Sequence, residues 1–212
     1  SDALIYALTY AGSKQLILRR TYGELEKTLI RQALDLYPRE IFKFESSRHC
    51  GRFANGSIID FGSLDAPNDI YKYQSAEYDI VRFDELTHFT EEMYRYLISR
   101  VRGANEFPKS VKSTTNPGGL GHSWVKARFI DPAPPDTAFT AGGLSRIFLP
   151  ARLCDNPHLE RADPDYRRRL ELLGERERKA LLDGCWDLFE GQYFAEFDRE
   201  VHVVEPFALP RH

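Results

Sequence analysis

The sequence predicts an α/β fold built on a mainly parallel sheet. Short apolar runs alternate with segments of helical periodicity, and polar or charged residues directly follow several of these runs. At 212 residues, with 42% hydrophobic and 13% aromatic residues, the chain can form one sizeable domain with an ordinary core. Extensive disorder is therefore not expected.

Charge and cysteine content narrow the functional class. Lys and Arg number 29 against 32 Asp and Glu, so a net charge of −3 gives no overall basic field, although a local basic patch remains possible. Cys50, Cys154 and Cys185 are widely spaced, which favours neither a disulfide framework nor a zinc site. No apolar run approaches the roughly 18–20 residues that span a bilayer, so we expect no membrane partner.

The chain begins with helical character. Leu4, Leu8 and Ala11 fall on one stripe of a helix over residues 2–10. Residues 15–19, with Leu16, Ile17 and Leu18 at their centre, then predict a short buried strand. Because a domain normally opens with a strand or a disordered tail, we expect that an upstream segment has been cut away.

The next segment predicts a capped helix and then a hairpin. Thr21 and Glu24 have the spacing of a capping box, and the helix that they open must end before Pro38. Apolar runs follow at 41–44, 51–53 and 57–61. Since Asn55-Gly56 separates the last two runs, we expect a small antiparallel hairpin insertion.

The strand over residues 78–83 ends in two adjacent acids, Asp84 and Glu85. The remaining expected elements are a helix over 91–101 capped by Thr90, a strand over 110–115, a helix over 121–129, a short core strand over 146–149, and helices over 165–173 and 175–182.

Polar side chains gather at predicted strand ends, where parallel sheets bind their ligands. Arg19, Asp84, Glu85, Thr115 and Asn116 all occupy such positions. We therefore expect the acids at 84 and 85 and the amide at 116 to surround a common cavity. The alternatives are a pair of solvated strand-end acids and a simple Asn-Pro turn.

Seven motifs in this order resemble the ATPase domain of the large terminase subunit of tailed bacteriophages, the motor that packages DNA. Each motif is modest alone, and the ordered set is specific. The motifs are LILRRTYGEL (16–25), FDELTHF (83–89), SRVRG (99–103), TTNPGG (114–119), GHSWV (121–125), DNP (155–157) and LDGCWD (182–187).

The resemblance implies an ASCE-type P-loop NTPase fold. Residues 1–153 would form a truncated ATPase core, 154–190 a helical subdomain or lid, and 191–212 a linker toward a nuclease domain. The family's G-x-x-x-x-G-K-[ST] loop would end at Ser1. We therefore expect a fragment without the P-loop and the nuclease domain, and we expect it to be inactive alone because the phosphate cradle is missing.

The resemblance also assigns roles at the strand ends. Asp84 would hold Mg²⁺, together with Ser1, and Glu85 would polarise the attacking water. Thr114, Thr115 and Asn116 would sense the γ-phosphate of ATP and couple hydrolysis to DNA movement.

Four arginines are further candidates. Arg19 and Arg20 resemble the segment with which helicase-like motors touch a nucleic-acid backbone; the alternative is a strand-end surface pair. Arg100 and Arg102 are candidates for an arginine finger donated to a neighbouring subunit. Residues 71–75, where some family members carry the finger, contain no Arg, and the alternative for Arg102 is the basic face of a solvated helix.

The implied cofactors are ATP and Mg²⁺. The implied partners are double-stranded DNA, the portal protein, a small terminase subunit and sibling subunits of a homo-oligomeric ring, in the host bacterial cytoplasm and transiently docked on the procapsid. Two alternatives remain: a non-catalytic DNA- or portal-binding module, and another ASCE motor such as a helicase.

Overall fold

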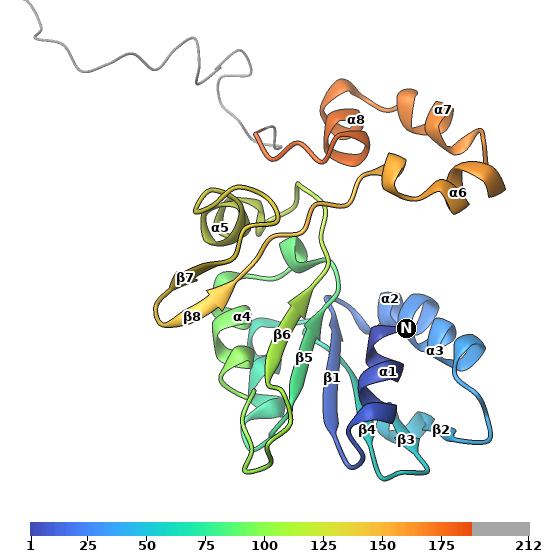
Figure 1. Cartoon of the computed structure of the whole chain (residues 1–212), viewed down its shortest axis with the longest axis vertical. Coiled ribbons are helices and arrows are strands. Elements are labelled where there is room, and N and C mark those ends of the chain that lie inside the picture. Colours follow the sequence, from blue (N-terminus) through green and yellow to red (C-terminus); the bar gives the residue numbers. More distant parts are fainter. Residues whose placement is uncertain (188–212) are drawn as a thin grey trace, which may run out of the picture.

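A six-stranded sheet forms the centre of the computed structural model, which describes residues 1–187 and, of Glu160 and Arg176, only the backbone (Figure 1). The order is β2-β3-β4-β1-β5-β6, with β4, β1, β5 and β6 parallel to one another. The predicted α/β class with a mainly parallel sheet is confirmed. The strands are β1 (Lys14–Arg19), β2 (Phe42–Glu45), β3 (Cys50–Phe53), β4 (Ile58–Ser63), β5 (Ile80–Phe83) and β6 (Ser110–Ser113).

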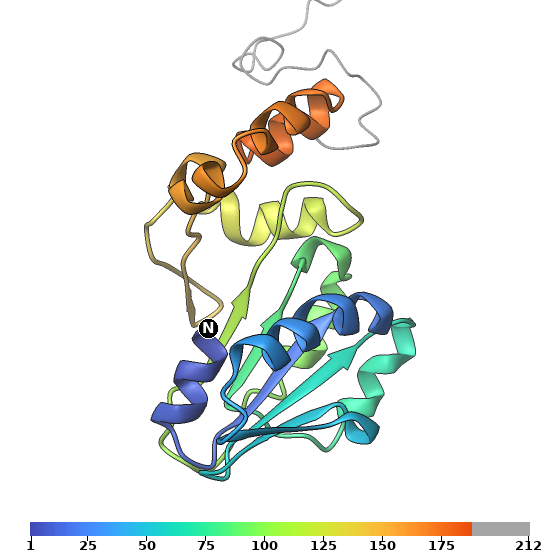
Figure 2. The same cartoon turned by 90° about the vertical axis from the view of Figure 1, so that its right-hand side faces the viewer.

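Helices cover both faces of this sheet, which gives a three-layer arrangement (Figure 2). The segment 22–36, predicted as one helix, contains a π-helical turn between α2 and α3. The helices are α1 (Asp2–Thr9), α2 (Tyr22–Leu25), α3 (Arg31–Leu36), α4 (Glu91–Ile98), α5 (His122–Val125), α6 (Pro157–Ala162), α7 (Tyr166–Glu171) and α8 (Glu175–Leu182), with π turns at Glu26–Ile30 and Lys126–Ile130.

The alternation of side chains along β1 explains the two layers. Leu16 and Leu18 point to the face covered by α4, whereas Ile17 points to the face covered by α1, α2 and α3. Since both faces are buried, β1 reads as a continuous apolar run, as central parallel strands do.

The first helix buries a different stripe from the one predicted. Ala3, Tyr6 and Ala7 are buried, whereas Leu8 is 48% exposed. The prediction of a stripe through Leu4, Leu8 and Ala11 is therefore wrong. Small alanines let the helix approach the sheet closely, and the Tyr6 hydroxyl donates a hydrogen bond to the carbonyl of Pro108 at 2.8 Å, which fixes the rotation of α1.

The predicted helix caps and the hairpin are confirmed, but only half of the capping box forms: among the described residues Glu24 Oε2 has no hydrogen-bond partner. The hydroxyls of Thr21 and Thr90 accept from the backbone N–H of Glu24 (3.4 Å) and Met93 (3.2 Å). The Asn-Gly turn joins β3 to β4, with Gly56 at a φ of +87°. Because β4 also pairs in parallel with β1, this hairpin extends the central sheet.

The core strand predicted over 146–149 is wrong. Residues Leu144–Arg146 form β8, which pairs only with β7 (Phe139–Ala141) in a separate two-stranded sheet. The turn between these strands is Gly142-Gly143, with φ values of +60° and +75°, and such a turn closes a local hairpin. Leu149 is accordingly 64% exposed.

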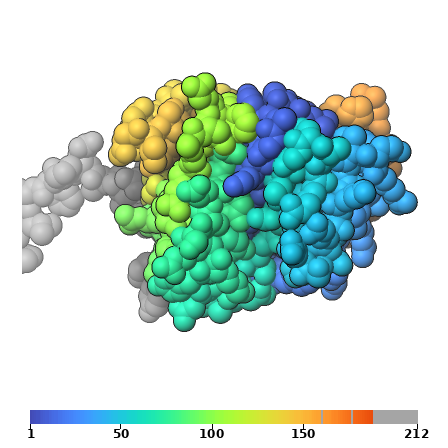
Figure 3. All heavy atoms as spheres, turned by 90° about the horizontal axis from the view of Figure 1, so that it is seen from below, coloured from blue at the N-terminus to red at the C-terminus, as the bar shows by residue number. Residues whose placement is uncertain are grey.

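The carboxyl ends of the parallel strands lie together at one end of the sheet, and α5 to α8 lie beyond these strand ends (Figure 1). The opposite edge, seen from below, is covered by α1, the β2–β4 region and the segment that follows α4 (Figure 3). The predicted division at residue 154 stays a prediction, and the predicted linker at 191–212 lies outside the described residues. Among the described helices, none has the length and apolarity that a membrane crossing requires.

Candidate functional site

Asp84 is held between the ends of two neighbouring strands. Its backbone N–H donates to the carbonyl of Leu18 at 2.8 Å, which continues the pairing of β5 with β1. The Thr114 hydroxyl, from the end of β6, donates to Asp84 Oδ1 at 2.6 Å, and Arg19 Nη1, from the end of β1, contacts Asp84 Oδ2. The sheet order thus brings together three of the residues predicted from separate motifs.

Arg19 lies among three carboxylates. Besides Asp84, its Nε is 3.6 Å from Glu24 Oε2. Burial by itself lowers the pKa of Arg19, but the hydrogen bond to Asp84 and the charges of Asp84, Glu85 and Glu24 outweigh burial and raise it. Arg19 therefore stays charged and neutralises part of an acidic strand end, a contact that its motif does not reveal.

Glu85 adopts an uncommon backbone conformation. Its φ of 56° and ψ of 64° place it in the left-handed region, where a non-glycine residue costs about 1–3 kcal/mol. The next residue donates its N–H to the carbonyl of Thr114 at 2.9 Å, which holds the turn in place. Such strain concentrates at functional sites, so the conformation supports a role for this carboxylate.

The segment after β6 is tied to the turn after Glu85. Thr115 Oγ1 accepts from the N–H of Thr87 at 3.2 Å and donates to Thr87 Oγ1 at 3.0 Å. Thr87 Oγ1 in turn donates to the carbonyl of Asn116 at 3.2 Å. The two motifs therefore form one hydrogen-bonded unit.

Two cavities lie beside the residues at the strand ends, whereas the sequence predicted a single cavity. Asp84 and Ser1 line a cavity of about 410 Å³. Asn116 and Thr115 line another of about 640 Å³, and Thr114 belongs to both linings. Among the described residues, Glu85 is part of neither lining. The expectation of a common cavity for 84, 85 and 116 is therefore wrong: Thr115 and Asn116 are bonded to Thr87 and line a different cavity from Asp84.

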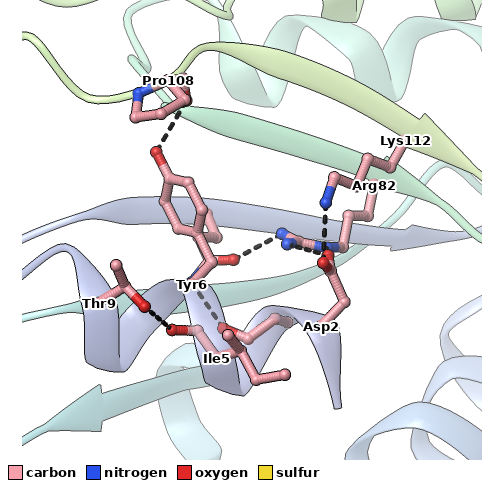
Figure 4. A network of polar contacts seen from close by, with 9 residues as sticks. Asp2, Ile5, Tyr6, Thr9, Arg82, Pro108 and Lys112 are labelled. Atoms are coloured by element: carbon pink, nitrogen blue, oxygen red, sulfur yellow. Dashed lines mark hydrogen bonds and ion pairs between the residues drawn. The ribbon is translucent and has the colours of Figure 1, made fainter.

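A polar network fastens the first turn of α1 to three strands (Figure 4). Asp2 Oδ2 accepts from Arg82 Nη2 at 2.7 Å, and Asp2 Oδ1 accepts from Lys112 Nζ at 2.8 Å. Arg82 also donates to Gln15 Oε1 at 2.5 Å, and Gln15 Nε2 donates to the carbonyl of Ala3 at 3.0 Å. Sequence reasoning missed this network, although the alternation of β5 places Arg82 and Asp84 on one face.

This network predicts a pH-dependent contribution to stability. Burial alone would raise the pKa of Asp2, but the hydrogen bonds and charges of Lys112 and Arg82 outweigh burial and lower it below the ordinary value of 3.8. A lowered pKa stabilises the fold above the unfolded-state value and loses that effect as the pH falls through the folded-state value. Urea unfolding should show Asp2→Asn less stable than the wild type at neutral pH.

The difference should shrink once the pH falls below about 4 and disappear below the lowered folded-state pKa, where Asp2 is protonated in both states. A difference that persists unchanged into acid would contradict the role of the Asp2 charge.

Arg100 and Arg102 lie at the opposite edge of the sheet from Asp84. Val101 between them bridges to Tyr78, before the amino end of β5, so about 20 Å of strand separates this point from Asp84 at about 3.3 Å per residue. Arg100 lies over the Tyr96 ring at 5.2 Å, and Arg102 Nε is 3.5 Å from Glu77 Oε1. Neither side chain therefore reaches the Asp84 of its own chain.

A buried histidine links the segment after β6 to the end of the described chain. His122 Nδ1 accepts from the N–H of Gly118 at 2.9 Å, so the Nε2 at 3.0 Å from the Trp186 carbonyl carries the proton. Burial lowers the pKa of His122 and favours this neutral form. Sequence reasoning also missed this link, because the Gly118 N–H and the Trp186 carbonyl are backbone groups that no side-chain motif marks.

The donor set at Asp84 fits a magnesium ion. Mg²⁺ prefers oxygen ligands and is commonly held by one or two carboxylates together with water and phosphate. Asp84 and the Thr114 hydroxyl supply such oxygens, and Ser1 lines the same cavity as these two residues. Among the described residues, no group of three or more His, Cys, Asp or Glu side chains is suited to a metal ion such as zinc.

The fold resembles solved large terminases. A structure of the large terminase from a thermophilic bacteriophage superimposes with a TM-score of 0.68 at 18% identity, covering 99% of this chain and 49% of that one. Complexes of the same phage terminase with ADP and with ATP-gamma-S superimpose with TM-scores of 0.66, also at 18% identity, and cover 99% of this chain and 49% and 48% of those chains. At this identity the likeness establishes the fold alone.

The three-layer α/β arrangement, with a mainly parallel sheet and acids after the end of β5, is the fold of these solved large terminases. The family described as "Terminase large subunit, T4likevirus-type, N-terminal" matches residues 1–201, and the chain belongs to it. The chain spans about half the length of the solved terminases that it matches. A comparison with curated proteins found no match.

Proposed function

We propose that this chain is the ATPase part of a phage large terminase subunit that powers the translocation of double-stranded DNA into the procapsid. The observation that carries the proposal is the arrangement around Asp84. The acid is held between the ends of β1 and β6 and is followed by Glu85 in a strained left-handed turn. Membership of the terminase family supports the same role.

The strand-end residues divide the chemistry between them. Asp84, with Ser1, would hold the Mg²⁺ of a bound ATP, and that ion neutralises charge on the phosphates. Glu85 would orient a water and accept its proton while the water oxygen attacks the γ-phosphorus and the bond to the β–γ bridging oxygen breaks. The turn that carries Glu85 is held by the bond from the Leu86 N–H to the Thr114 carbonyl, which fixes the backbone at Glu85.

The segment 114–118 is suited to transmit this reaction. Thr114 contacts Asp84, Thr115 and Asn116 are bonded to Thr87, and Gly118 is bonded through His122 to Trp186. A change of hydrogen-bond partner at Thr114 can therefore reach the end of the described chain through a continuous set of contacts. This continuity supports the proposed sensing and coupling role of Thr114, Thr115 and Asn116.

The roles proposed for the other arginines and for the partners concern the intact motor. Arg20 would contact the DNA backbone, and Arg100 or Arg102 would act on the nucleotide of a neighbouring copy, because neither reaches its own chain's Asp84. The proposed partners are DNA, the portal protein, a small terminase subunit and further copies in a ring. The site of action would be the host cytoplasm, with transient docking on the procapsid.

The test compares this 212-residue chain with a longer chain of the same protein that includes a G-x-x-x-x-G-K-[ST] loop. We expect the longer chain to bind ATP in calorimetry and to release phosphate, and the 212-residue chain to do so far more weakly, because the loop supplies most phosphate contacts. Micromolar ATP affinity of the 212-residue chain would contradict the second expectation. A longer chain that binds DNA without releasing phosphate would favour a non-catalytic module, and strand displacement would favour a helicase.

A further inference from the structure

Arg19 has two carboxylates nearby, and it forms a hydrogen bond with only one of them. Its Nη1 donates to Asp84 Oδ2, while its Nε stays 3.6 Å from Glu24 Oε2, beyond hydrogen-bond distance. Among the described residues, neither Arg19 Nε nor Glu24 Oε2 has a hydrogen-bond partner, although both atoms are buried. A small movement of the guanidinium toward Glu24 would satisfy both atoms.

The charges around Arg19 are unequal. One guanidinium faces the carboxylates of Asp84, Glu85 and Glu24, so these four side chains together carry a net charge of −2. That charge is complementary to a divalent cation. The site can therefore hold Arg19 and a divalent cation together, provided that they do not occupy the same oxygen.

In this structure Arg19 and a divalent cation would compete for one oxygen of Asp84. Asp84 Oδ1 accepts from the Thr114 hydroxyl at 2.6 Å, and Asp84 Oδ2 accepts from Arg19. A cation that binds Asp84 through Oδ2 takes the position of the Arg19 donor. The second acceptor for that donor is Glu24, in the first turn of α2.

We propose that Arg19 is an exchangeable counter-ion of Asp84, which neutralises this acid in the metal-free state and moves to Glu24 when a divalent cation binds. The inference rests on the proposed role of Asp84 as a metal ligand. It makes Arg19 a positioning residue rather than a direct DNA contact.

The exchange would connect metal binding to α2. Glu24 lies three residues after Thr21, whose hydroxyl caps its N–H. Arg20, the proposed DNA contact, lies between Arg19 and that cap. A change of partner from Asp84 to Glu24 would therefore join the metal site to the first turn of α2, close in sequence to Arg20.

The test measures divalent-cation binding directly, with Mn²⁺ as the probe and electron paramagnetic resonance as the readout, on the 212-residue chain. Arg19→Gln removes the competing donor, so the Kd for Mn²⁺ should fall about threefold to fivefold, the size of one displaced ion pair. Lys27→Gln is the matched control, because it removes one positive charge from an exposed position near α2. It should change the Kd by less than about twofold, because exposed charges are screened.

A second pair of variants tests the alternative position of Arg19. Glu24→Gln weakens that position and should raise the Kd for Mn²⁺ several-fold, whereas the exposed Glu26→Gln should not. In the wild type, the hydrogen-exchange rate of the Arg19 Nε–H, followed by NMR, should fall when Mg²⁺ is added, because Nε gains an acceptor. This measurement needs no variant to fold.

The outcomes separate the two proposals. If Asp84→Asn leaves Mn²⁺ binding unchanged, the metal-ligand role of Asp84 is wrong. If Asp84→Asn weakens binding but Arg19→Gln behaves like Lys27→Gln, the metal role stands and the counter-ion role is wrong. An Arg19 Nε–H exchange rate that Mg²⁺ does not alter would also overturn the counter-ion role.

Discussion

Replacing Glu85 with Gln should lower the rate of ATP hydrolysis by about 10²–10⁴-fold in a chain that includes the phosphate-binding loop, the range typical of a lost general base. Gln keeps the size of the side chain but cannot accept a proton from water. The barrier would rise by about 3–5 kcal/mol, at 1.36 kcal/mol per factor of ten. Phosphate release at saturating ATP measures the effect.

A second substitution at the same position separates chemistry from folding. Glu85→Gly removes the carboxylate but fits the left-handed backbone at a φ of 56°, so it should leave the protein as stable as the wild type or more stable by about 1 kcal/mol. Its hydrolysis should be as low as that of Glu85→Gln. Residual hydrolysis within tenfold of the wild type in either variant would contradict the proposed role.

Gly121→Ala should be strongly destabilising, by about 3 kcal/mol. A Cβ at Gly121 would lie 2.6 Å from the Phe89 carbonyl oxygen and 2.8 Å from that of Thr87. Neither oxygen can move cheaply, because the first accepts from Trp124 Nε1 at 2.9 Å and the second from the Gly121 N–H at 2.7 Å. The free energy of unfolding in urea measures the loss.

The matched control is Gly23→Ala in α2, where a Cβ would meet nothing within 4 Å and φ is not positive. It should be neutral or stabilising by up to about 1 kcal/mol, because alanine favours the helix. Equal stability of the two variants would show that the turn after Glu85 does not depend on close contact with Gly121. A large loss confined to Gly121→Ala would establish that α5 is packed directly on this turn.

Local sequence patterns were sufficient to predict the central strands and the starts of two helices. The apolar runs ending at Arg19 and Asp84 predicted β1 and β5, and Thr21 and Thr90 marked helix starts, because caps and alternation depend on neighbours in sequence. The same reasoning failed at Leu8 and at residues 146–149. In those places the outcome depended on which helix face packs on the sheet and on a glycine turn that closed a local hairpin.

The order of motifs determined the family, and the positions of Asp84 and Glu85 at a strand end indicated where the site lies. The tertiary structure decided which side chains meet there. Arg19, Asp84 and Thr114 come together only because β5 lies between β1 and β6, an order that no local pattern encodes. Ion pairs between strands arise from sheet order and side-chain direction, so the contact of Arg19 with Asp84 became visible only in three dimensions.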